Sequence, residues 1–274
     1  MNFLQFEFEP HNHQEAEQLI ALLANQGFDG FVEEGVTLLA FIPEANFSQA
    51  DFEQTLEKFA ILAYTKSSIE NINWNQKWES EFEPVIVEQF AAIRAHFHPA
   101  IQSVQHEVII TPKMSFGTGH HATTYMMIRL MKDIDFTGKS VLDFGTGTGV
   151  LAILAEKLGA TQLLAIDYDE WSITNAIENC GQNNCQLTVV QQADKVPANG
   201  QYDVILANIN LNVLLQAMPA ISAACNTGGK VLLSGFLITD EAAIVACAQK
   251  NGLAQVLVLQ RNEWISIVCE KIKI

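Results

Sequence analysis

The residues best suited to chemistry form a glycine-rich loop in the middle of the chain. Gly145 and Gly147 belong to VLDFGTGTGVLA, residues 141–152, which lies between a buried strand and a helix. In that context, a glycine loop lets a ligand approach the backbone closely. The spacing disfavours an NAD or FAD site, whose fingerprint needs glycine or alanine where Val150 stands. No Gly-Lys-Ser/Thr sequence follows, which excludes a P-loop. An acid two residues before the first glycine, Asp143, favours a cationic or amine-bearing ligand instead.

Two polar side chains end strands that follow the loop in sequence. Asp167, in AIDYDE, comes 22 residues after Gly145. A carboxylate at the end of the second strand of an open α/β sheet can accept both hydroxyls of a ribose. The alternative for such an aspartate is a helix cap, and we assign that role to Asp169. Asn208, in LANINLN, would point into the crevice at the carboxyl ends of the strands, while Asn210 suits the following helix cap better.

Together these residues resemble the class I methyltransferases that use S-adenosylmethionine, whose positive sulfonium and ammonium suit an acid-flanked loop. The side-chain carbonyl of Asn208 can accept a hydrogen bond from an amine without adding a charge that would keep the amine protonated. The sequence Asn208-Ile209-Asn210-Leu211 differs from the Asn-Pro-Pro-Tyr or Asp-Pro-Pro-Tyr of glutamine or nucleobase methylation, and it offers no ring to stack on a base. We therefore predict that Asn208 is catalytic, that a neutral amine attacks the methyl group directly, and that no dedicated general base takes part.

The segment TPKMSFGTGHHATT, residues 111–124, precedes this core. A metal site at His120 and His121 is disfavoured because adjacent histidines diverge and no Cys, Asp or Glu lies at ligand spacing. We interpret the segment as a lid and access loop over the methionine end of the cofactor. Phe116 would close over the cofactor, although core packing is its alternative.

The resemblance narrows when further motifs are added. TPKMSFGTGHHATT, DFGTGTG, IDYD, ANI, LSGF and the linker WNQKWESEFEPV are similar to the methyltransferases of the eleventh large-subunit ribosomal protein. In that family, a mobile N-terminal domain recognises the ribosomal substrate, and the C-terminal domain methylates its lysine ε-amines and N-terminal α-amine. The resemblance implies S-adenosylmethionine contacts at Thr124, Gly145, Asp167 and Asn208, to which we add Phe116, Gly117 and Gly147.

Two alternatives stay open at this point. The chain could methylate another protein or an RNA, or it could be a module that binds S-adenosylmethionine without catalysis. The acidic composition counts against RNA, because phosphate contacts need Lys and Arg. Intact Gly145, Asp167 and Asn208 count against a module without catalysis.

The elements that must position these residues alternate strictly from about residue 120. Strands are predicted at 140–144, 162–166, 203–208 and 229–235, with helices between them and a hairpin at the end. This pattern predicts an α/β fold with a doubly wound, Rossmann-like parallel sheet, to which the hairpin adds an antiparallel strand, as in the class I methyltransferases.

The N-terminal part has a different pattern. Strands at 2–8 and 35–43 alternate with helices at 13–25 and after Ser48, and a further strand is expected near SSIENIN. This order suggests a small α+β domain of ferredoxin-like type. We predict a substrate-recognition domain over residues 1–66, a linker over 67–100 and a methyltransferase domain over 101–274.

Charge is distributed unevenly along the chain. Of the net −16, residues 1–99 carry −12 (16 acids, 4 bases) and residues 100–274 carry −4 (15 acids, 11 bases). Such a balance disfavours bare nucleic acid as the main partner. It favours a basic protein partner attracted to the N-terminal third, with plain solubility as the alternative.

Five cysteines without a C-x-x-C pair argue against a disulfide framework and against a zinc cluster, and they fit a reducing cytosol. The start MNFLQFEFEP lacks the basic residues of a signal peptide, and no run of about 18 apolar residues predicts a membrane span. We therefore expect a cytoplasmic protein with no metal, while the oligomeric state stays open.

Overall fold

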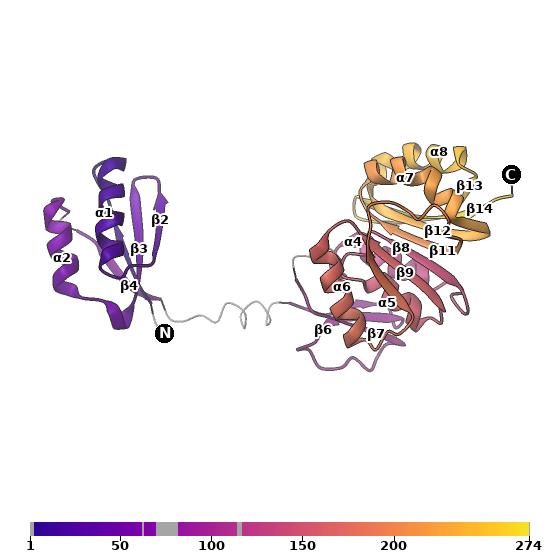
Figure 1. The fold of residues 1–274 in the computed structure, drawn as a ribbon, viewed down its shortest axis with the longest axis horizontal. Coiled ribbons are helices and arrows are strands. Elements are labelled where there is room, and N and C mark those ends of the chain that lie inside the picture. The colour runs from indigo at the N-terminus through magenta and orange to yellow at the C-terminus, as the bar shows by residue number, and fades with distance from the viewer. Residues whose placement is uncertain (1–2, 62, 70–81, 114–116, 274) are drawn as a thin grey trace. The chain divides into compact units, whose positions relative to one another are not determined.

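The computed structural model describes residues 3–61, 63–69, 82–113 and 117–273. The chain divides into two units, residues 1–81 and 82–274, each with its own internal contacts (Figure 1). We describe each unit by itself.

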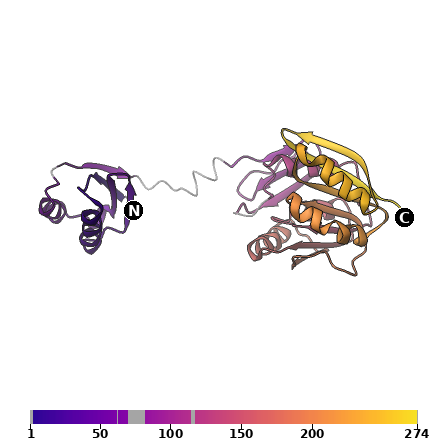
Figure 2. The same cartoon turned by 90° about the horizontal axis from the view of Figure 1, so that it is seen from above.

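The first unit is a four-stranded antiparallel sheet with two helices. Its elements run β1 (Phe3–Phe8), α1 (His13–Asn25), β2 (Gly30–Glu34), β3 (Thr37–Pro43), η1 (Glu44–Asn46), α2 (Gln49–Lys58) and β4 (Thr65–Ile69). The strand order is β2-β3-β1-β4, which with this element order is the ferredoxin-like arrangement. Figure 2 shows both helices on the same side of the sheet.

The first unit is held together by aromatic side chains on that side of the sheet. Phe6, Leu4 and Phe8 face inward from alternate positions of β1. Phe52 of α2 is fully buried, and its ring centroid lies 4.4 Å from that of Phe6 and 5.6 Å from that of Phe28. Ser48 caps α2 as predicted, since its side chain accepts from the Asp51 N–H.

The second unit begins with a small sheet of β5 (Val85–Val87), β6 (Ala91–Ala95) and β7 (His106–Ile110), in which β6 and β7 are parallel. This arrangement differs from the predicted boundaries of 1–66, 67–100 and 101–274. β4 pairs with β1 through Ile69, so the first unit extends beyond residue 66. Residues 82–100 contribute two paired strands to the second unit, so they are no linker. Residues 70–81, the rest of that predicted linker, lie outside the described residues.

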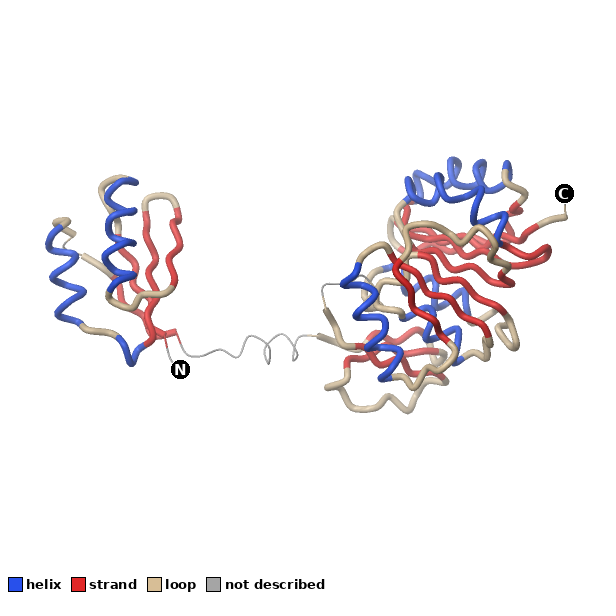
Figure 3. The backbone as a smooth tube through the Cα atoms, viewed as in Figure 1, coloured by secondary structure: helices blue, strands red, loops and turns tan. Residues whose placement is uncertain are grey.

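A larger sheet of seven strands forms the rest of the second unit (Figure 3). Its order is β10-β9-β8-β11-β12-β14-β13, and all pairings are parallel except those of β14. The strands are β8 (Ser140–Phe144), β9 (Gln162–Asp167), β10 (Thr188–Gln192), β11 (Tyr202–Asn208), β12 (Cys225–Leu237), β13 (Leu253–Arg261) and β14 (Trp264–Lys271). The predicted doubly wound sheet with a closing antiparallel hairpin is confirmed.

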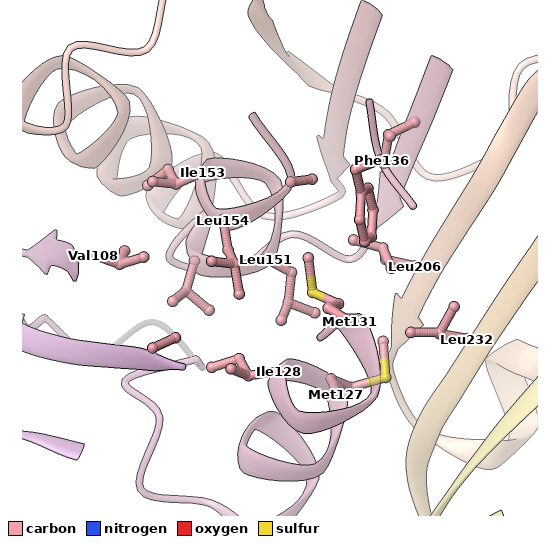
Figure 4. Packing of buried hydrophobic residues seen from close by; sticks show 14 of the residues in the cluster. Val108, Met127, Ile128, Met131, Phe136, Leu151, Ile153, Leu154, Leu206 and Leu232 are labelled. Carbon is pink, nitrogen blue, oxygen red and sulfur yellow. The ribbon is translucent and has the colours of Figure 1, made fainter. Parts of the chain in front are cut away.

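Helices cover both faces of this sheet. They are α4 (Ala122–Met131), α5 (Val150–Lys157), α6 (Glu170–Gln182), α7 (Leu211–Ala224) and α8 (Glu241–Lys250), with a 3-10 turn η2 (Ile238–Asp240) before α8. One core cluster joins α4 and α5 to the sheet, and Figure 4 shows Met127, Ile128 and Met131 beside Leu151 and Leu154. A second cluster joins α7 and α8 to the opposite face.

The strand order reverses direction beside β8, because β9 and β10 follow on one side and β11 and β12 on the other. Ligands of open α/β sheets bind at such a switch point, outside the carboxyl ends of the strands. None of the helices in the described part of the chain is long and apolar enough to cross a membrane. All five cysteines are free thiols.

Candidate active site

A cavity of about 500 Å³ opens at the carboxyl ends of β8, β9 and β11. Its size is in the range of small-molecule and cofactor sites. Residues from seven stretches of the second unit line it: His121, Thr123, Phe144, Gly145, Gly147, Asp167, Tyr168, Asp169, Ser172, Ala193, Asp194, Asn208, Ile209, Asn210, Val213, Gly235 and Trp264.

The glycine loop forms one wall of the cavity because its backbone is pinned to neighbouring strand ends. The N–H groups of Gly145 and Thr146 donate to the carbonyl of Ile166, at 2.8 and 2.9 Å. Gly145 has φ of +78°, and a Cβ there would lie 2.1 Å from Cγ2 of Ile209. A side chain at this position would therefore both strain the backbone and collide with Ile209, the residue that follows β11.

Asp167 ends β9 and joins the glycine loop to the cavity. Its Oδ2 accepts from the Gly147 N–H at 2.9 Å, and its Oδ1 accepts from the Asp169 N–H at 3.1 Å. The side chain is buried, yet each carboxylate oxygen retains a lone pair for a further donor. Asp169 caps α6 as predicted, since its Oδ2 accepts from the Ser172 N–H at 2.9 Å.

Asp143 lies behind the loop, and it is absent from the cavity wall. It is buried, and its Oδ2 accepts from the Thr146 hydroxyl at 2.6 Å. Burial raises the pKa of this carboxyl to about 7. Its influence on a ligand therefore passes through the loop, whereas Asp167, Asp169 and Asp194 are the carboxylates that line the cavity.

Asn208 ends β11 on the other side of the cavity. Its Nδ2 donates to the hydroxyl of Thr124 at 3.3 Å, and both side chains are buried. Its Oδ1 is buried and has no hydrogen-bond partner among the described residues. A buried acceptor without a donor costs about 1–3 kcal/mol, so such atoms point to a functional demand. Asn210 caps α7 as predicted, accepting from the Val213 N–H at 3.1 Å.

The segment 111–124 is anchored by hydrogen bonds at Thr111 and at Gly117. The Thr111 N–H donates to Asn179 Oδ1 at 2.8 Å. Further along, the Gly117 carbonyl accepts from the Thr148 hydroxyl at 2.8 Å, which ties the segment to the glycine loop. Gly117 does not itself line the cavity. Phe116 lies outside the described residues, so its predicted position over the cofactor stays a prediction.

The two histidines of this segment have separate partners. His120 is exposed, and its Nε2 lies 2.9 Å from the Glu83 carbonyl oxygen. His121 is the N-cap of α4 and accepts from the Thr123 N–H at 3.3 Å. In the part of the chain that the structure describes, no three His, Cys, Asp or Glu side chains are arranged to hold a metal.

Sequence reasoning missed Trp264 and Gly235. Trp264 is the first residue of β14 and pairs with Leu237 at the end of β12, so an antiparallel strand starts at the edge where the parallel strands end. The turn just before WISIV was the available signal. Gly235 has φ of +99°, and a Cβ there would lie 2.2 Å from the carbonyl oxygen of Ile209. It therefore allows β12 to approach the residue after Asn208.

The two sides of the cavity differ in chemistry. Asp167, Asp169 and Asp194 lie at the ends of β9 and β10, whereas the side formed by β11, β12 and β14 carries no carboxylate among the lining residues. The ring of Trp264 meets that of His121 edge to face, with centroids 4.5 Å apart. Burial lowers the pKa of His121, so this side chain is neutral near pH 7.

The doubly wound sheet with antiparallel β14, the glycine loop after β8 and the carboxylate that ends β9 define a class I S-adenosylmethionine-dependent methyltransferase. The family model of the ribosomal protein L11 methyltransferase (PrmA) matches residues 8–272. The chain belongs to this family.

Curated relatives agree over almost the whole length. The ribosomal protein L11 methyltransferase of Bacteroides fragilis is 36% identical over 97% of this chain and 99% of its own. That of Porphyromonas gingivalis is 40% identical over 91% and 88%, respectively. The crystal structure of a ribosomal protein L11 methylase from Lactobacillus delbrueckii subsp. bulgaricus is 27% identical, with a TM-score of 0.65 over 70% of this chain and 100% of that one. A methyltransferase from Pyrococcus furiosus, 20% identical with a TM-score of 0.52 over 61% and 90%, shares the fold.

Proposed function

We propose that this protein transfers methyl groups from S-adenosylmethionine to amines of ribosomal protein L11, namely lysine ε-amines and the N-terminal α-amine. Family membership and the names of the relatives support the substrate. The observation that carries the proposal for an amine is the buried Oδ1 of Asn208, which has no partner among the described residues and belongs to a residue that lines the cavity.

The residues around the cavity fit the cofactor. We propose that Asp167 accepts the ribose hydroxyls with the lone pairs that Gly147 and Asp169 leave unused. Gly145 provides backbone without a side chain at the close approach to Ile209. Gly117 and Thr124 are proposed to position residues nearer the cofactor, because Gly117 accepts a hydrogen bond from Thr148 and Thr124 accepts one from Asn208. The contact of Phe116 with the cofactor is proposed on the family resemblance alone.

When bound, S-adenosylmethionine supplies an electrophilic methyl group on a positive sulfonium. The residues of this chain then have to orient an amine and keep it neutral. Asn208 does the first, because its amide oxygen accepts an N–H and so aims the nitrogen lone pair away from itself. It also does the second, because an uncharged acceptor does not stabilise the ammonium, whose ordinary pKa for lysine is about 10.4.

No group on the amine side of the cavity is proposed as a general base. The lining side chains there are neutral, and the His121 ring accepts a hydrogen bond from the Thr123 N–H as the N-cap of α4. Exclusion of water and positioning are the main contributions of the protein. Deprotonation of the amine would then precede its entry, so the rate rises with pH through the amine alone.

The acidic N-terminal third would recognise the substrate. Residues 1–99 carry a net charge of −12, which attracts a basic protein and repels RNA. A ribosomal-protein substrate also fits a cytoplasmic location, and five free thiols fit a reducing compartment.

Mass spectrometry of purified L11 incubated with this protein and S-adenosylmethionine tests the proposal. The expected result is a gain of methyl groups on L11 that requires all three components. An unchanged L11 together with a modified RNA or another modified protein would overturn the substrate assignment. Calorimetry with S-adenosylmethionine separates a failed substrate from a chain that binds no cofactor.

Two variants at one position test the mechanism. Asn208→Ala removes the acceptor, and we expect turnover to fall on the order of 100-fold. Asn208→Asp keeps the shape but adds a charge that favours the ammonium, so its activity should be low at neutral pH and recover partly at higher pH. Wild-type turnover by Asn208→Ala would show that the amine binds elsewhere.

A further inference from the structure

The inference concerns the side of the cavity opposite the carboxylates, and it rests on the proposed function. Trp264 and His121 form an aromatic wall there, and Asn208 lines the same cavity. We propose that Trp264, braced by His121, is a specificity-determining residue that holds the partly methylated amine and so sets how many methyl groups each amine receives.

The wall is built to keep its geometry. Trp264 starts β14 and is paired on both sides, with Leu237 of β12 and with Arg261 of β13. His121 is fixed as the N-cap of α4, with its Nδ1 2.7 Å from the Thr123 hydroxyl. The two rings pack edge to face with centroids 4.5 Å apart, so a change in one ring alters the packing of the other.

Charge on this side of the cavity is low. The other lining residues at the ends of β11 and β12 are Asn208, Ile209, Asn210, Val213 and Gly235, none of which carries a formal charge. A positive nitrogen that forms here would therefore lie near the Trp264 indole, with no competing carboxylate among the lining residues of this side. Cation–π attraction to tryptophan is the strongest of its kind, and it suits methylated ammonium groups.

The number of N–H bonds on the amine separates the roles of Asn208 and Trp264. A neutral primary amine offers two N–H donors, a neutral monomethylated amine offers one, and a neutral dimethylated amine offers none. An amide oxygen can therefore orient the amine for the first and second transfers but has no donor to accept in the third. An aromatic face needs no N–H, and its contact grows as methyl groups are added.

In each transfer the C–S bond of the sulfonium breaks, its electron pair stays on sulfur, and the nitrogen lone pair forms the new N–C bond. Positive charge therefore passes to nitrogen in every step, and the ammonium formed by the first or second transfer loses a proton to solvent before the next transfer. Hydrogen bonds share that charge in the early steps, whereas the last step depends on the aromatic wall. Loss of Trp264 should consequently affect late transfers more than early ones, and loss of Asn208 should do the reverse.

Time courses of L11 methylation test this division. Tandem mass spectrometry follows one modified amine as its mono-, di- and trimethylated forms appear, and three successive rate constants are fitted for wild type, Trp264→Ala, Trp264→Phe and Asn208→Ala. We expect Trp264→Ala to slow the third transfer on the order of tenfold and the first less than threefold. Trp264→Phe should restore most of the third step, and Asn208→Ala should slow the first step most.

The outcomes separate this inference from the proposed function. Equal slowing of all three steps by Trp264→Ala, or wild-type product that stops at one methyl group, would overturn the inference while leaving the methyltransferase activity in place. Absence of any wild-type product on L11 would overturn both. Calorimetry with S-adenosylmethionine and thermal melting of each variant distinguish a lost amine site from a lost cofactor site or a misfolded protein.

Discussion

The two units of the protein bury different kinds of side chain. In the described residues of the first unit, Thr55 is the one buried polar side chain, and the core is otherwise apolar and rich in phenylalanine. The second unit buries polar side chains throughout, among them Thr123, Thr124 and Asp143. Buried Asp167 and Asn179 likewise bond to the backbone of the glycine loop, since Asp167 accepts from the Gly147 N–H and Asn179 donates to the Thr148 carbonyl.

The difference indicates what each unit is built for. An apolar core stabilises a fold without fixing the direction of individual hydrogen-bonding groups. Most buried polar groups are hydrogen-bonded, and those bonds hold loops in one arrangement. The second unit therefore buries polar side chains where ligand atoms must be positioned, whereas the first unit has almost none.

The largest effect on ligand binding that would break this contrast is expected at the glycine loop. Gly145→Ala forces a left-handed residue, which costs about 1–2 kcal/mol, and brings its Cβ against Ile209. We expect the dissociation constant for S-adenosylmethionine to rise on the order of 100-fold, about 3 kcal/mol, by calorimetry. Gly138→Ala is the matched control, because Gly138 also has positive φ, +69°, but has open space around it. Equal losses in both variants would mean that strain alone matters.

Disruption of the core of the first unit should weaken binding of L11 without changing the affinity for the cofactor. Phe52→Ala removes a fully buried ring and should lower the unfolding free energy of the first unit by about 3–5 kcal/mol. In differential scanning calorimetry we expect the transition of the first unit to move and that of the second to stay. KM for L11 should rise while cofactor affinity is unchanged. The control Leu22→Ala alters a side chain that is 38% exposed and should leave both transitions in place. A loss of cofactor affinity in Phe52→Ala would contradict independent units.

Buried charge in the second unit should appear as a pH effect. The pKa of Asp143 is raised from 3.8 in the unfolded chain to about 7 in the fold. Between these values the folded state binds more protons, so stability from this group is present at low pH and is lost as pH rises toward 7. Asp143→Asn removes that dependence. Relative to wild type, its unfolding free energy should increase by on the order of 2 kcal/mol between pH 5 and pH 8 in urea titrations. A constant difference would place the titration elsewhere.

The smallest expected effect concerns the net charge of residues 1–99. Salt screens exposed charges at roughly 10 Å in 0.1 M solution. Raising NaCl from about 0.05 to 0.3 M should therefore raise KM for L11 a few-fold and leave kcat unchanged. Steady-state kinetics measures both, and S-adenosylmethionine affinity serves as the internal control. An unchanged KM would leave solubility as the sole role of the acidic residues.

Local motifs carried most of the site that could be predicted. The glycine loop, Asp167 and Asn208 each end or follow a short buried strand, so sequence and position in the fold are tied together. The caps Asp169 and Asn210 were predictable for the same reason, since a cap acts within a few residues of itself. Asp143 also belongs to a local motif, but its exclusion from the cavity wall depends on how the loop folds over it.

Long-range placement explains what was missed. Trp264 reaches the cavity only because β14 runs antiparallel, and its partner His121 lies far away in sequence. The segment 82–100 was predicted as linker because β5 and β6 are short, and their pairing with β7 cannot be read from local composition. β2 has no counterpart among the predicted strands, because the predicted strand 35–43 begins at Gly35, whereas Gly35 lies in the turn that joins β2 to β3.

Asp167 has a consequence for how this protein can change over time. One carboxylate lines the cavity and also holds the Gly147 N–H and the Asp169 N–H. A neutral or longer side chain at this position would loosen the loop at the same moment as it altered the ligand contact. Ligand preference and loop integrity are therefore inherited together, and drift toward another cofactor would require the glycine loop and the end of β9 to be rebuilt in a single step.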